Sequence, residues 1–74
     1  MSEITDIYVY LPNEGMDAWR PVKAEHVQDD LFRIVDMKED EDEVWEFNFG
    51  DLVVCKMTEF AEGQHLAAVC IAYQ

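Results

Sequence analysis

Basic residues are scarce in this sequence. Five lysines and arginines stand against seventeen aspartates and glutamates in 74 residues, which gives a formal net charge of −12 at pH 7. Nucleic acids and anionic membranes are themselves highly negative, and proteins bind them through clustered Lys and Arg side chains. The composition therefore excludes nucleic acid and membrane surfaces as partners, and it predicts that a protein partner has a basic surface.

We expect no segment that directs the protein into or across a membrane. There is no run of about 18 apolar residues, and residues 1–6 show neither the basic nor the apolar region of a signal peptide. We expect a cytoplasmic protein with a single domain, residues 1–74. A core of this size gives modest stability, to which formation of a homo-oligomer would add.

Glycine and proline are few, and they divide the chain into short apolar runs. The three glycines, Gly15, Gly50 and Gly63, each stand between two such runs, as turn residues do in a β meander. Alternation of apolar and polar residues within the runs is typical of strands. The expected strands are residues 4–11, 17–27, 31–37, 44–49, 52–60 and 66–73.

The apolar pattern also predicts which side chains are buried. In run 4–11, Ile7, Val9 and Leu11 share one face and the tyrosines share the other. Run 44–49 is the clearest half-buried strand, because three aromatic residues alternate there with their neighbours. We expect these aromatic residues, Trp45, Phe47 and Phe49, to lie in the core.

In three other runs the pattern does not define a single buried face. The apolar face of run 17–27 changes phase around Pro21, which predicts a bulge or an edge position there. Either face of run 31–37 could be the buried one. Residues 52–55 are apolar on both faces and are expected to be covered on both sides.

Five or six short strands are too few for an immunoglobulin-sized sandwich, whereas closure into a barrel removes exposed sheet edges. We therefore expect an all-β fold, a small SH3-like barrel of five or six antiparallel strands. The alternative is an α+β domain with one short helix at about residues 57–69, where several residues favour helix but Gly63 interrupts them.

The two cysteines lie in the last two expected strands. A two-residue loop centred on Glu62 and Gly63 would place Cys55 directly opposite Cys70. We expect two buried thiols that pack together, because reducing compartments rarely hold structural disulfides. A disulfide that acts as a redox switch is the alternative.

No residue pattern typical of catalysis or metal binding is present. The acidic run Glu39, Asp40, Glu41, Asp42 and Glu43 lacks the ligand spacing of a calcium loop, and we expect it to form an exposed, solvated tip. The two histidines share no zinc-binding spacing with the cysteines, and the negative charge of the chain opposes thiolate formation. We predict a protein that is not an enzyme and has no catalytic residue, cofactor or metal.

The candidate interaction surface is formed by Tyr8, Tyr10, Trp19 and Arg20. Aromatic residues and arginine are the types that most often anchor protein interfaces. If Val9 packs inward, the two tyrosines face outward on one strand. The alternative is that side chains of the neighbouring strand or the chain termini cover these rings.

Two segments show a resemblance to known proteins. Residues 8–22 contain a Tyr-Leu…Glu-Gly…Trp-Arg-Pro-Val pattern, and residues 44–53 contain Trp-Glu-Phe…Gly-Asp. In both, the chain resembles small uncharacterised bacterial proteins. The resemblance implies a stand-alone bacterial domain, and it brings no activity, ligand or catalytic residue with it.

Three functions are consistent with the sequence. The leading hypothesis is a non-enzymatic module that binds another protein through its acidic surface. A first alternative is an inhibitor or immunity-type protein that binds a basic enzyme or mimics nucleic acid. A second is a regulator that responds to a divalent metal bound at Glu39–Glu43 or to a small ligand in a shallow pocket formed by the aromatic strands.

Overall fold

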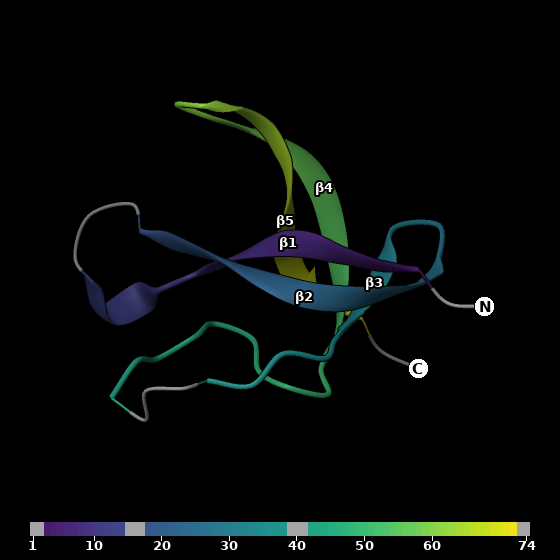
Figure 1. Ribbon diagram of the computed structural model, residues 1–74, viewed down its shortest axis with the longest axis horizontal. Helices are drawn as coiled ribbons and strands as arrows, with labels where there is room; N and C mark the ends of the chain where they lie inside the picture. The colour runs from purple at the N-terminus through teal and green to yellow at the C-terminus, as the bar shows by residue number, and fades with distance from the viewer. Residues whose placement is uncertain (1–2, 15–17, 39–41, 73–74) are drawn as a thin grey trace.

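Five strands form the framework of the protein (Figure 1). A computed structural model describes residues 3–14, 18–38 and 42–72. The strands are β1 (Ile4–Tyr10), β2 (Trp19–Gln28), β3 (Leu31–Ile34), β4 (Leu52–Phe60) and β5 (Gly63–Ile71), and a 3-10 turn, η1, covers Pro12–Glu14. No helix within the described ranges is long and apolar enough to cross a membrane.

The strands close into a barrel in the order β1-β2-β3-β4-β5. Strands that follow one another in sequence pair antiparallel, and a parallel contact between Tyr8 in β1 and Ala67 in β5 closes the barrel. The prediction of a small all-β barrel, consistent with an SH3-like fold, is confirmed. The alternative with a helix at 57–69 is wrong, because these residues form the β4–β5 hairpin.

Alternation along the strands sets the core. Ile7 and Val9 of β1 are fully buried and Leu11 nearly so, as their spacing predicts. In β3, where the sequence left both faces open, Phe32 and Ile34 are the residues that point inward. The core cluster is made up of Ile7, Val9, Leu11, Val22, Ala24, Phe32, Ile34, Trp45, Phe47, Val53, Cys55 and Ala68.

Pro21 occupies an edge position. It lies opposite Tyr8 of β1, in a part of β2 that β3 does not reach, since β3 pairs only with Ala24–Gln28. Proline has no N–H to give to a ladder, so this one-sided part of β2 accommodates it. The bulge in β2 lies instead between His26 and Gln28.

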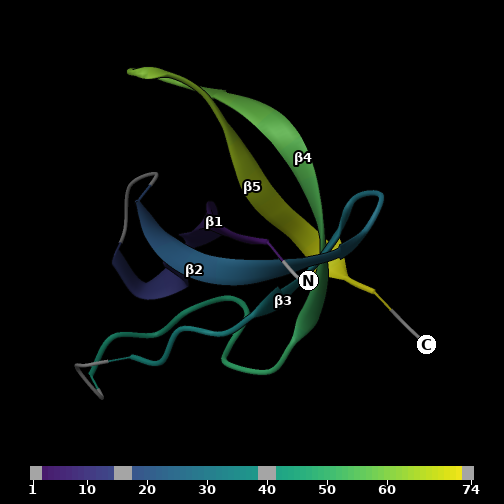
Figure 2. The ribbon, with the colours of Figure 1, turned by 45° about the vertical axis from the view of Figure 1, so that its right-hand side comes forward.

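The prediction of a strand at residues 44–49 is wrong. The segment carries no strand ladder, and one backbone bond, from the Glu46 N–H to the Tyr10 carbonyl at 2.9 Å, joins it to the end of β1. It runs past β1 and β2 on the side away from the β4–β5 hairpin (Figures 1 and 2). Trp45 and Phe47 are buried in the core as predicted, but Phe49 is 56% exposed.

A tight corner at Gly50 returns this segment to the barrel. Gly50 has a φ of +88°, a conformation that favours glycine. Its N–H donates to the Ile34 carbonyl at 2.8 Å, and the Ile34 N–H donates to the Asp51 carbonyl at 3.0 Å. These bonds prolong the contact with β3 beyond its last residue and direct the chain into β4.

The β4–β5 hairpin has a different register from the one predicted. Phe60 pairs with Gly63, so the two loop residues are Ala61 and Glu62, and a bulge between Val54 and Cys55 shifts the pairing again. Cys55 therefore lies opposite Ala68, and Cys70 opposite Val54. Cys55 is buried and Cys70 is exposed, both as free thiols, so the predicted Cys55–Cys70 contact is wrong.

The hairpin extends beyond the barrel and curves over β1 and β2. Figures 1 and 2 both show its tip arching above the two strands, opposite the loops that run below them. The β1–β2 ribbon is thus covered on two faces: the core and the 42–50 segment lie on one side, and the end of the hairpin lies on the other.

The aromatic row at 45, 47 and 49 gives a matched stability test. Replacing Phe47 with alanine should lower the free energy of unfolding by about 3 to 5 kcal/mol, because it empties a buried site. Replacing Phe49 with alanine should change it by less than about 1 kcal/mol, because that ring is mostly in solvent. Urea unfolding of both variants measures the difference, and equal losses would contradict the described burial.

Candidate interaction surfaces

The outer face of β1 and β2 carries a cluster of rings. Tyr10 pairs with Trp19 across the two strands, with ring centroids 5.3 Å apart. Tyr8 stacks on Phe60 at 4.9 Å and lies 5.0 Å from the ring of His65, and Trp19 meets Phe60 edge-on at 5.3 Å. Phe60 and His65 come from the overhanging hairpin, so the cluster holds the hairpin against the barrel.

All five rings are partly buried and partly exposed. The prediction grouped Tyr8, Tyr10 and Trp19, and the structure brings these three together. It also adds Phe60 and His65, which no sequence pattern associates with them. Only the curvature of the hairpin brings these two residues over β1, and no local pattern in the sequence signals that curvature.

Arg20 lies apart from this cluster. It follows Trp19 in β2, so its side chain points to the opposite face, the one that carries Val22. Arg20 Nη2 donates to Glu43 Oε2 at 2.9 Å, and the indole Nε1–H of Trp45 donates to Glu43 Oε1 at 2.6 Å. The four residues of the candidate interaction surface are therefore divided between two faces of the ribbon.

The environment of Glu43 stabilises its charged form. The hydrogen bond from Trp45 and the bonds from Arg20 lower the pKa of the Glu43 carboxyl below its usual value. The carboxylate links β2 to the 42–47 segment and fixes the indole of a core tryptophan. We interpret this part of the predicted surface as structural.

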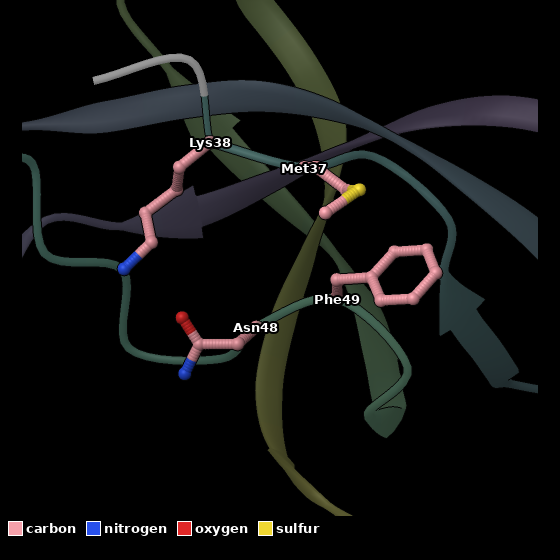
Figure 3. A pocket seen from close by; sticks show the side chains of 4 residues that line it. All are labelled: Met37, Lys38, Asn48 and Phe49. Carbon is pink, nitrogen blue, oxygen red and sulfur yellow. The ribbon is translucent and has the colours of Figure 1, made fainter. Parts of the chain in front are cut away.

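A second surface lies where the chain leaves β3 and approaches β4. Met37 and Lys38 on one segment and Asn48 and Phe49 on the other line an open hollow of about 460 Å³ (Figure 3). Met37 is 65% exposed and Phe49 56%. The hollow therefore combines two exposed apolar side chains with an amine and an amide.

Two aspartates fix the backbone at this hollow. Asp36 accepts from the Met37 N–H at 3.0 Å and from the Lys23 N–H of β2 at 3.3 Å. Asp51 accepts from the Asn48 N–H at 2.8 Å, and its own N–H donates to the Asn48 carbonyl at 3.0 Å. Carboxylate-to-backbone bonds of this kind hold irregular segments in one conformation.

The acidic run can be placed only in part. Glu39, Asp40 and Glu41 lie outside the described residues, whereas Asp42 is exposed and Glu43 is partly buried beside Arg20. Within the described ranges no three His, Cys, Asp or Glu side chains are grouped as a metal ion requires.

Burial, together with the charge of Asp30, raises the pKa of the Cys55 thiol to about 12.

Comparison with known proteins identifies no relative. No protein-family model, no curated protein and no solved structure matches the chain. We therefore infer the function from the charge of the protein and the chemistry of its two surfaces.

The pKa shift of Glu43 gives a testable pH dependence. Because the folded-state pKa is lowered, the carboxylate stabilises the fold above its unfolded pKa of about 4.3, and this contribution is lost as the pH falls through the folded value. Glu43→Gln should therefore cost about 1 kcal/mol at pH 7 and progressively less below about pH 4. Denaturant unfolding from pH 7 to pH 3 measures this, with the exposed Glu46→Gln as the control. A pH-independent difference would contradict the assignment.

The two thiols should differ sharply in reactivity. The thiolate is the reactive form, and burial with a pKa of about 12 leaves almost none of Cys55 as thiolate at pH 8. Exposed Cys70 should react quickly with iodoacetamide, and Cys55 only after unfolding. Mass spectrometry of the native protein should show one rapid addition, which Cys70→Ser abolishes. Two rapid additions would contradict the described burial and register.

Proposed function

We propose that this protein is a non-catalytic interaction module that binds a protein with a basic surface. The observation that carries the proposal is the excess of carboxylates on a folded surface. The net charge is −12, and no charged side chain in the described residues is buried. Ion pairs such as Lys23 with Asp6 and Arg20 with Glu43 neutralise only a minority of the acids.

A charge of this size acts mainly on the encounter between partners. It attracts a basic surface over about one Debye length, close to 8 Å at physiological salt, and so raises the association rate. It also repels acidic proteins, which narrows the range of partners. Binding of this kind weakens steeply as salt concentration rises.

The distribution of the described carboxylates favours a protein partner over imitation of nucleic acid. They lie before and on β1, in η1, on β2, in the β2–β3 turn, after β3, on the 42–51 segment and around the hairpin tip, so they are spread over many elements. Phosphates of a nucleic acid backbone are regularly spaced, whereas a basic protein surface needs only a broad negative field. We therefore place general protein binding first.

Affinity capture at two salt concentrations tests the proposal. The immobilised protein should recover specific basic proteins from a bacterial lysate at about 0.05 M salt and lose them at about 0.5 M, where screening is strong. An unrelated domain of equal net charge serves as the control for simple ion exchange. The proposal fails if nothing is recovered beyond this control at either salt concentration.

A further inference from the structure

We propose that the hollow lined by Met37, Lys38, Asn48 and Phe49 docks a basic amphipathic segment of the partner protein. An apolar side chain of that segment fits between Met37 and Phe49, and its Lys or Arg side chains approach carboxylates of the two segments that line the hollow. The inference rests on the proposed function, because it identifies where a basic partner binds.

The exposed apolar pair is the first observation that supports this docking site. Phe49 continues the alternation of Trp45 and Phe47, but the core ends at Phe47 and the third ring stays in solvent beside Met37 (Figure 3). Covering such a side chain removes apolar surface from water and therefore favours binding. Methionine and phenylalanine are also enriched at interfaces, and methionine adapts to different partner side chains.

The second observation is that the hollow is formed before any partner arrives. Asp36 fixes the backbone at Met37, Asp51 fixes it at Asn48, and the Gly50–Ile34 bond joins the two segments at their base. A surface held in one conformation pays little ordering entropy when it binds. The hollow is open to solvent, and its volume of about 460 Å³ leaves room for one anchoring side chain.

Charge identifies the occupant. Along the described parts of the two lining segments, five acidic residues (Asp36, Asp42, Glu43, Glu46 and Asp51) accompany one basic residue, Lys38. An anionic ligand would meet this field and the net charge of the whole protein. A segment with an apolar anchor flanked by Lys or Arg meets complementary chemistry at both places.

A substitution at Lys38 tests whether the ligand in the hollow is positively or negatively charged. Its amine lines the hollow opposite Asn48 (Figure 3), where it would weaken a cationic ligand and strengthen an anionic one. Lys38→Gln should therefore tighten binding of a basic peptide two- to threefold. Tightening after loss of a binding-site lysine is not expected for an anionic ligand.

A defined peptide tests the site directly. The probe is an amphipathic helix-forming peptide of about 16 leucines and lysines, and the control peptide has the same lysines with serine in place of leucine. Isothermal titration calorimetry at about 0.05 M salt measures Kd. Phe49→Ala and Met37→Ala should each weaken the leucine peptide about tenfold. Met57→Ala, a methionine of β4 that is 60% exposed, should leave Kd unchanged.

The outcomes separate this site from the broader proposal. Selective weakening by the Met37 and Phe49 variants, with tightening by Lys38→Gln, supports docking at the hollow. Equal binding by all variants, or by both peptides, overturns the site and leaves a diffuse acidic surface as the binding element. Weakening by Lys38→Gln overturns the cationic occupant. Failure of the module itself would appear separately, as an affinity capture that recovers nothing.

Discussion

The structure depends on β1 being covered on both of its faces. Ile7, Val9 and Leu11 enter the core, while Tyr8 and Tyr10 on the opposite face meet rings from β2 and from the β4–β5 hairpin. The same strand pairs with β2 along its length and contacts β5 to close the barrel. In a chain of 74 residues one core buries a limited area, and the second cluster outside it adds apolar contacts that also anchor the hairpin.

The 42–51 segment contributes to the core from outside the sheet. It supplies Trp45 and Phe47 to the core without joining the sheet. Arg20 and Trp45 donate hydrogen bonds to Glu43, and the Asp51 carboxylate accepts one from the Asn48 N–H, so that the segment is held in place. Because the segment runs across the barrel and then turns at Gly50, its last aromatic residue falls outside the core. This path leaves an exposed apolar pair, Met37 and Phe49, at the hollow for which we propose docking.

The described acidic residues lie outside the buried core. Carboxylates occupy strand faces and turns that solvent reaches, and two of them, Asp36 and Asp51, stabilise the backbone by accepting hydrogen bonds from N–H groups. Others remain on the surface and create the field that would attract a basic partner. The rings of the aromatic cluster, by contrast, are partly buried against one another.

The sequence by itself determined the all-β class, the bounds of β4, the buried face of β1 and the corner at Gly50, because period-2 alternation and turn residues are local signals. Local signals identify which side of a segment is apolar, but not which segment pairs with it. Residues 44–49 alternate like a strand, yet the closed barrel gives them no strand to pair with along their length. The register of the last hairpin depended on one loop position and one bulge, which together moved Cys70 away from Cys55. The grouping of Tyr8 with Phe60 and of Met37 with Phe49 was decided only by the tertiary structure, since hairpin curvature and chain path bring together residues that are distant in sequence.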